Sequence, residues 1–124
     1  MNNSTQMVTT VVHALQEKKA QDIKALDISA LSDIGDAFVI ASASNSNQLS
    51  ALMDEIEKEM HKQGFSTRQI EGTQHSGWIL MDYYDVIVHL FTVEDRSFYH
   101  IERVWAEAKN IPIENNKLPL KRQI

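Results

Sequence analysis

Two hydrophobic stretches, residues 78–82 and 85–91, are separated by only two tyrosines, and this spacing predicts an antiparallel β-hairpin. A two-residue turn at 83–84 would place Trp78 opposite His89. Directly opposed residues lie on the same face of a sheet. One face of this hairpin would then be entirely aliphatic, which is typical of the side that packs beneath helices. That predicted core face carries Ile79, Met81, Val86, Val88 and Leu90.

The second face of the hairpin mixes aromatic, aliphatic and ionisable side chains: Trp78, Leu80, Asp82, Asp85, Ile87, His89 and Phe91. This composition is unusual for a core and for a solvated surface. It is typical of protein interfaces, where aromatic side chains carry the affinity and a few polar groups orient the partner. We therefore expect a partner to bind this face. The alternative, which the sequence leaves open, is that Trp78 and Phe91 cover a second, smaller core under the N-terminal helix.

The rest of the chain supplies helices and strands around this hairpin. Hydrophobic periodicity predicts helices over about 5–19, 47–63 and 95–109, and strands over 23–28, 38–43 and 65–70. The order is helix, strand, strand, helix, three strands, helix. It predicts an α+β fold with three helices on a mixed sheet of about five strands. The strand–helix–strand segment predicts a right-handed parallel crossover.

Capping residues define the second helix. Asn45 is the expected N-cap, Gln48 stands at capping-box spacing from it, and Gly64 is suited to the left-handed position after the last turn.

A chain of 124 residues corresponds to one domain, which we expect over residues 1–110, with 111–124 as an irregular C-terminal tail. No apolar stretch approaches the ~18–20 residues that cross a bilayer. The N-terminus lacks the features of a signal peptide, and the chain has no cysteine. We therefore expect a cytoplasmic protein without a membrane partner.

The charge balance argues against nucleic acid as the direct partner. The chain has 17 acidic and 12 basic residues and a net charge of −5. Proteins that grip a phosphate backbone usually present a basic face, and the one local basic cluster here is Lys117, Lys121 and Arg122. We expect a basic protein partner and no sequence-specific contact with nucleic acid. An RNA chaperone is the weaker alternative.

An enzymatic alternative rests on Asp82 and Asp85, which would face each other at the predicted turn. With His89 or Asp95 nearby they could bind a divalent cation, as the paired carboxylates of nucleotidyl transferases do. The sequence has no GxxxxGK phosphate loop, and its five histidines form no HxH or HExxH motif. We therefore expect no catalytic residue, no metal site and no cofactor.

The chain resembles the ribosomal silencing factor family, RsfS or Iojap-like. The segments that carry the resemblance are 36–48, 71–72, 78–82, 85–91 and 96–105. The resemblance implies a fold similar to nucleotidyl transferases without their catalytic motif. It implies a translation regulator, not an enzyme, that binds the large ribosomal subunit through its ribosomal protein fourteen. Bound there, the regulator blocks joining of the small subunit when nutrients are scarce. Family members often form homodimers, and organellar relatives act in ribosome assembly, which is the alternative function.

The matching motifs and the mixed face together define the expected contact residues. These are Gly72, Trp78, Leu80, Asp82, Tyr83, Ile87, His89, Phe91, Arg96, Tyr99 and Glu102. We expect Trp105, on the helix stripe, to be a core residue.

Overall fold

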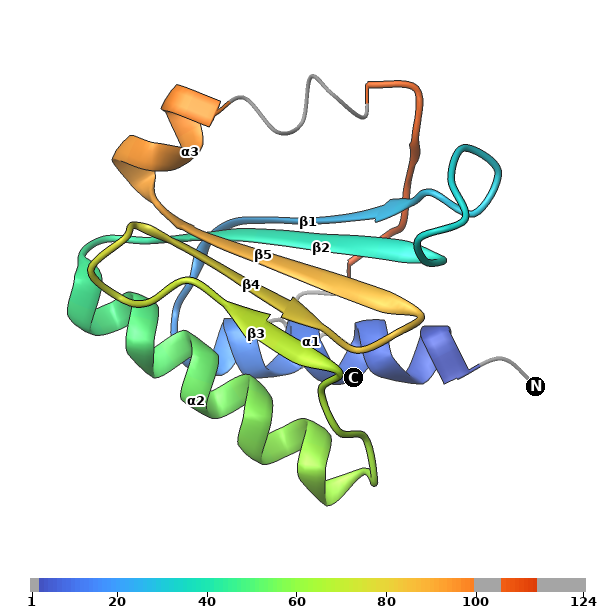
Figure 1. Ribbon diagram of the computed structural model, residues 1–124, viewed down its shortest axis with the longest axis horizontal. Coiled ribbons are helices and arrows are strands. Elements are labelled where there is room, and N and C mark those ends of the chain that lie inside the picture. Colours follow the sequence, from blue (N-terminus) through green and yellow to red (C-terminus); the bar gives the residue numbers. More distant parts are fainter. Residues whose placement is uncertain (1–2, 100–105, 114–124) are drawn as a thin grey trace, which may run out of the picture.

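The computed structural model describes residues 3–99 and 106–113. Its elements follow the predicted order, with one additional short strand at the end (Figure 1). They are α1 (Asn3–Glu17), β1 (Gln21–Asp27), β2 (Ala37–Ala43), α2 (Ser46–Lys62), β3 (Gln69–Glu71), β4 (Trp78–Asp82), β5 (Val86–Thr92), α3 (Val93–Tyr99) and β6 (Lys109–Asn110).

The strands form one mixed sheet in the order β3-β4-β5-β2-β1-β6. The central pair, β2 and β5, is parallel, and the other four pairs are antiparallel. The strand–helix–strand crossover therefore joins β2 to β3, which run in the same direction but are separated by β5 and β4. Within the described residues both edges of the sheet are short, with three residues in β3 and two in β6.

The sheet has six strands where about five were predicted, because Lys109 and Asn110 pair with Asp27 and Leu26. The prediction of helix as far as residue 109 was wrong at this end, since residues 106–108 form a turn before β6. A two-residue strand carries no alternating pattern from which it could be predicted. Residues 100–105, including Trp105, lie outside the described part of the chain.

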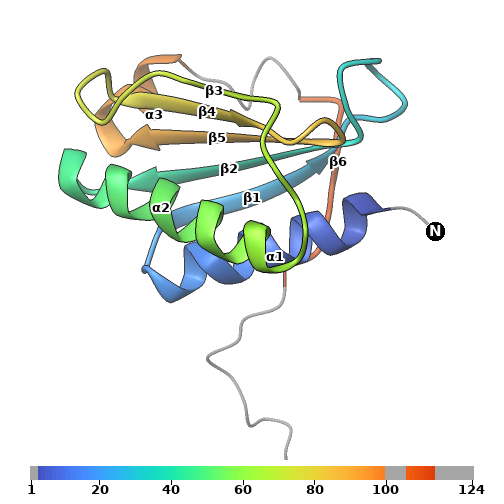
Figure 2. The ribbon, with the colours of Figure 1, turned by 60° about the horizontal axis from the view of Figure 1, so that its bottom comes forward.

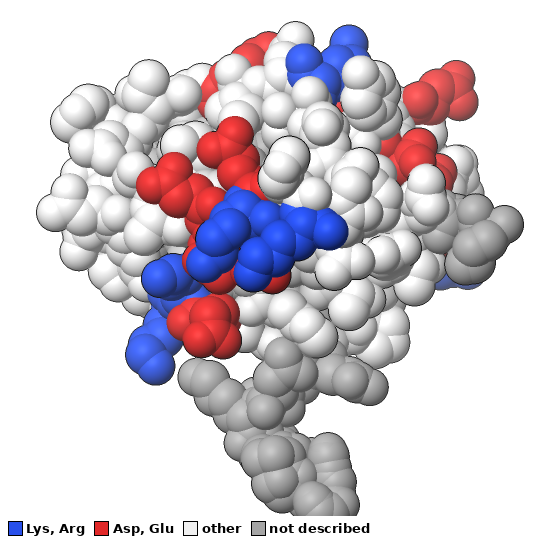
Figure 3. Space-filling model, turned by 90° about the horizontal axis from the view of Figure 1, so that it is seen from below, with Lys and Arg blue, Asp and Glu red and all other residues white. Residues whose placement is uncertain are grey.

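Helices α1 and α2 pack side by side on one face of the sheet, and α3 lies over one end of the opposite face (Figures 1 and 2). The main core lies between the sheet and helices α1 and α2. It includes all five aliphatic residues of the predicted core face of the hairpin: Ile79, Met81, Val86, Val88 and Leu90. On the outer side of the helices, acidic and basic side chains are interspersed (Figure 3), as in the ion pairs of Lys58 with Glu55 and Lys62 with Glu59. In the described ranges no helix combines the length and the apolar character needed to cross a bilayer.

The hairpin register differs from the prediction. Trp78 lies opposite Phe91, where His89 had been expected, and Asp82 lies opposite Ile87. The turn is formed by residues 84–85, one residue later than predicted, because the Tyr83 N–H donates to the Val86 carbonyl. Moving the turn by one residue shifts the pairing by two. An even shift leaves every side chain on its own face, so the separation into an aliphatic and a mixed face is confirmed.

The ends of α2 are formed as predicted. Asn45 Oδ1 accepts the Gln48 N–H at 2.8 Å, while the Gln48 side chain accepts the Ser44 N–H at 2.6 Å. The reciprocal hydrogen bond of the capping box therefore comes from the N–H of Ser44, the residue before the N-cap. Gly64 follows the helix with a φ of +88°, a conformation that side chains disfavour.

We predict that Asn45→Ala lowers the free energy of unfolding by ~1 kcal/mol, because it leaves the Gln48 N–H without its acceptor. Urea denaturation measures the change. Asn47→Ala is the matched control, since Asn47 is exposed in the first turn of α2. An equal loss in both variants would contradict the capping role.

Candidate interaction face

The sheet face opposite α1 and α2, here called the open face, carries a second core. This cluster consists of Leu26, Ile28, Phe38, Ile40, Ile87 and Phe91. Phe91 is only 1% exposed, so the alternative of a second, smaller core is confirmed for this residue. Its place was wrong, however, because the cluster lies on the face away from α1.

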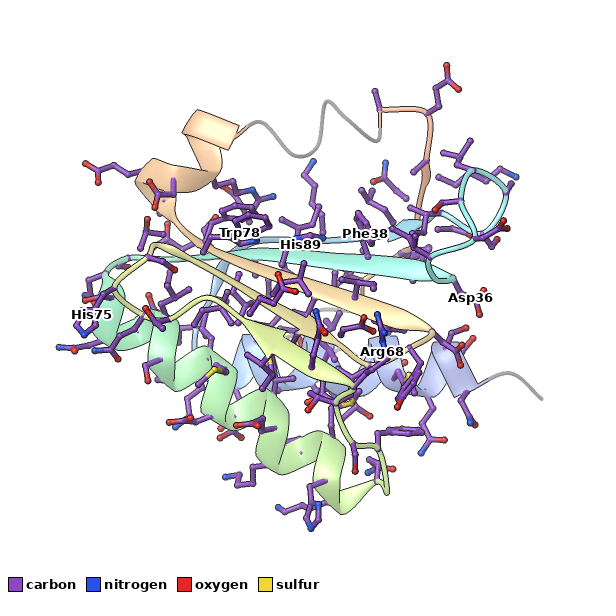
Figure 4. All side chains as sticks on the ribbon, in the orientation of Figure 1. Asp36, Phe38, Arg68, His75, Trp78 and His89 are labelled. Carbon is purple, nitrogen blue, oxygen red and sulfur yellow. The ribbon has the colours of Figure 1, made fainter. Side chains whose placement is uncertain are left out.

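Trp78 and Leu80 pack against this cluster and stay half-buried. The Trp78 ring stacks on Phe91 with centroids 5.7 Å apart and planes 7° from parallel. The His89 ring also stacks near both, with its centroid 6.1 Å from that of Trp78 and 6.3 Å from that of Phe91, and the Phe38 ring meets the His89 ring edge-on at 4.7 Å. Figure 4 shows Trp78, His89 and Phe38 in a row along the open face. Stacking against Phe91 and His89 thus holds the indole in one orientation.

His89 is a buried hydrogen-bond acceptor in this stack. Its Nδ1 receives the Trp78 Nε1–H at 3.4 Å, a long bond that requires the neutral ring. Burial lowers the pKa of His89 to about 4. Its Nε2, which then carries the proton, is buried and has no hydrogen-bond partner among the described residues.

The loop before β4 is fitted closely around the Trp78 backbone. Gly72 has a φ of +86°, and a Cβ there would lie 2.1 Å from the Trp78 carbonyl oxygen. Ser76 Oγ lies 2.8 Å from the same oxygen. At Gly77 a Cβ would collide with the Asp95 carboxylate at the start of α3. The loop and the start of α3 therefore position Trp78 together, at the end of the hairpin opposite its turn.

Arg96 was expected at the contact surface, but only 6% of it is exposed. Its Nη1 donates to the Asp22 carbonyl at 2.5 Å and to Ser42 Oγ at 2.9 Å. Asp22 interrupts β1, where the register shifts and φ is +49°. Arg96 thus ties α3 to β1 and β2 and acts as a positioning residue within the fold.

Asp82 is also buried, at 5% exposure, and its oxygens are already engaged. Oδ2 forms an ion pair with Arg68 Nη2 at 2.7 Å, and Oδ1 accepts the Tyr84 N–H at 2.8 Å. The pairing with Asp82 raises the pKa of Arg68. Asp82 thus stabilises the turn end of the hairpin through these two contacts, whereas the enzymatic alternative had it as a metal ligand. Within residues 3–99 and 106–113, no three histidine or carboxylate side chains form a group that could hold a metal ion.

Tyr83 was included in the expected contact set, but it belongs to the main core and is 1% exposed. Tyr83 follows β4 directly, and because side chains alternate along a strand it lies on the same face as Met81, beneath the helices. Burial raises its pKa. The side chain of Tyr99, and Glu102 entirely, lie outside the described residues.

The accessible part of the open face is therefore narrower than the predicted set. Of the predicted residues it retains Gly72, Trp78 and Leu80, while Ile87, His89 and Phe91 form the packed layer beneath. Two exposed residues of β3 join it, because Gln69 pairs with Asp82 and Glu71 with Leu80. The sequence predicted a strand over 65–70, where the structure has β3 at Gln69–Glu71, and it did not predict the pairing with β4, so these two residues were missed. We call Gln69, Glu71, Gly72, Trp78 and Leu80 the contact strip.

We predict that His89 makes stability depend on pH. Between pH 6.5 and about 4 the unfolded chain binds a proton that the folded protein does not. The free energy of unfolding therefore falls as the pH drops through this range, by up to ~3 kcal/mol from this residue. Urea denaturation of His89→Phe across this range should show a shallower slope than the wild type. His75→Phe, in an exposed loop, should keep the wild-type slope; the same change in both variants would contradict the prediction.

Comparison with known proteins places this architecture in one family. A family model described as "Ribosomal silencing factor during starvation" matches residues 1–123. The ribosomal silencing factor RsfS of Halalkalibacterium halodurans is 30% identical over 112 residues, covering 90% of this chain and 96% of that protein. The RsfS of Bacillus subtilis is 32% identical over 106 residues, covering 86% and 90%.

A solved structure agrees with the sequence relatives. The crystal structure of a Chromobacterium violaceum protein is similar with a TM-score of 0.81 and 26% identity, covering 97% of this chain and 99% of that one. Matches of this extent in sequence and in fold establish that the chain belongs to the ribosomal silencing factor family, RsfS.

Proposed function

We propose that the chain binds the large ribosomal subunit through its ribosomal protein fourteen and thereby blocks joining of the small subunit. The observation that carries the proposal is the contact strip, in which a half-buried tryptophan is held by stacked rings on the open face of a silencing-factor fold. Repression of translation in the cytoplasm during nutrient shortage follows from this block. The activity is regulatory and requires no catalytic group.

The geometry of Trp78 suits it to anchor an interface. Aromatic side chains dominate binding energy when they enter a desolvated pocket of the partner. A side chain already fixed against Phe91 and His89 loses little further rotamer freedom on binding, so less of the interaction energy is spent on ordering it. Leu80 and Gly72 beside it supply apolar and backbone surface.

The negative net charge of this chain favours binding to a basic ribosomal protein over binding to ribosomal RNA. A chain with net charge −5 is repelled by phosphate and attracted by basic ribosomal proteins. Glu71, exposed in the contact strip, adds a local acidic group toward such a partner. The factor then acts by occupying the surface that the small subunit needs.

The first test is subunit joining. Purified large and small subunits are mixed at a magnesium concentration that favours joining, with and without the protein, and separated on a sucrose gradient. We expect saturating protein to shift most joined particles to free subunits, with the protein in the large-subunit peak. Unchanged joining at saturation would contradict the proposed function.

The second test is Trp78→Ala. We expect it to weaken binding to the large subunit by ~30-fold to several hundred-fold, as loss of an interface anchor does. Because Trp78 is half-buried, the melting temperature should fall by only a few degrees. Co-sedimentation and thermal melting measure the two quantities.

Ile56→Ala is the control for this test, since Ile56 is fully buried in the main core, on the other side of the sheet from the contact strip. It should lower the melting temperature more than Trp78→Ala while the folded protein still binds. Native-like binding by Trp78→Ala would remove Trp78 from the interface. A melting temperature lowered as far as by a core truncation would do the same.

A further inference from the structure

The end of the sheet away from Trp78 exposes two large apolar side chains. Ile34, in the β1–β2 loop, is 55% exposed, and Tyr84, in the β4–β5 turn, is 60% exposed. Both loops lie at the same end of the sheet, where Figure 4 labels Asp36, whereas Trp78 lies toward the other end. At ~3.3 Å per residue along β4, Tyr84 stands roughly 20 Å from Trp78.

The two loops are fixed to one another by backbone contacts. The N–H groups of Asp36 and Ala37 donate to the Asp85 carbonyl at 2.7 and 3.2 Å. Gly35 makes this approach possible, because a Cβ there would lie 3.2 to 3.3 Å from the carbonyl oxygens of Asp85 and Tyr84. Ile34 and Tyr84 therefore extend from adjoining loops whose backbones are tied together.

Tyr84 is held in an unfavourable backbone conformation. Its φ is +73°, and the Asp85 N–H donates to the Tyr83 carbonyl across it, which is the hydrogen bond of a γ-turn. A γ-turn with positive φ is rare and strained, and glycine is the residue that tolerates it best. A large, exposed tyrosine at this position lowers stability and contributes nothing to either core. Strain of this kind is concentrated at functional sites.

Three acidic residues share the two loops with these apolar side chains: Asp33 is exposed, and Asp36 and Asp85 are half-buried. The nearby Arg68 is paired with Asp82. These acidic residues repel phosphate, and they would repel the same residues on a second copy of this chain. They complement a protein surface in which lysines or arginines surround an apolar side chain.

We propose that Ile34 and Tyr84 with Asp33, Asp36 and Asp85, here called the end patch, form a second protein-binding surface. Its partner is a basic protein segment with an exposed apolar side chain on the large ribosomal subunit. This rests on the proposed function, which it extends: the factor contacts the particle at two places roughly 20 Å apart along one hairpin. Two modest contacts joined by a rigid sheet give a higher affinity than either alone.

The decisive variant is Tyr84→Gly, because stability and binding should change in opposite directions. Removing the side chain relieves the strained φ, so the melting temperature should rise by ~2–4 °C. Removing the aromatic contact should weaken co-sedimentation with purified large subunits by ~5- to 30-fold. A variant that is more stable and yet binds less tightly cannot be explained by unfolding.

Two controls separate the causes. Tyr84→Phe keeps the ring and the strain, and it should bind as the wild type does. Lys19→Gly relieves another positive φ, of +62°, at the opposite end of the sheet. It should raise the melting temperature without a loss of affinity.

The other outcomes overturn the proposal in distinct ways. Wild-type affinity of Tyr84→Gly would show that the end patch is idle while leaving the proposed function intact. Tighter binding after Asp33→Lys would show RNA at this surface, and a loss of dimer in Tyr84→Gly with unchanged ribosome affinity would show a second copy. If the wild-type protein itself fails to co-sediment, the proposed function fails and this inference fails with it.

Discussion

Burial of the central strand pair on both faces is the constraint on which the rest of the structure depends. Every residue of β2 is buried, as is every residue of β5 except Thr92. Helices α1 and α2 cover one face only, so the opposite face of these strands needs an apolar cover of its own. On that face Phe38 of β2 and Ile87 and Phe91 of β5 pack into the second cluster, against which Trp78, Leu80 and Ala108 lie. The open face is therefore a core at its centre, with the contact strip accessible toward β3 and β4 and Lys24 exposed on the other side, in β1.

This arrangement explains which parts of the structure could be predicted from the sequence. Helix periodicity, the capping residues of α2 and the two-residue alternation of the hairpin are local signals, and each predicted its element. The assignment of faces held even though the register was wrong, because parity depends only on whether the shift is even. The turn moved because Asp85 is bound by Asp36 and Ala37, which are about fifty residues away along the chain. No local pattern reports such a contact.

The contact residues were harder to predict for the same reason. A mixed composition marked the right face, but exposure depends on what packs against it. His89, Phe91 and Arg96 are all buried, so each supports the surface from within. The ion pair between Arg68 and Asp82 spans fourteen residues and depends on the pairing of β3 with β4. Without that register, Asp82 had appeared to be a free carboxylate near a turn.

The brevity of the edge strands limits how this sheet can grow. With three residues in β3 and two in β6, each edge strand of the described sheet offers only a short backbone ladder to a further strand. Side chains, more than extension of the sheet, are therefore the means by which this fold can present a binding surface. Short edge strands also disfavour edge-to-edge assembly into fibres.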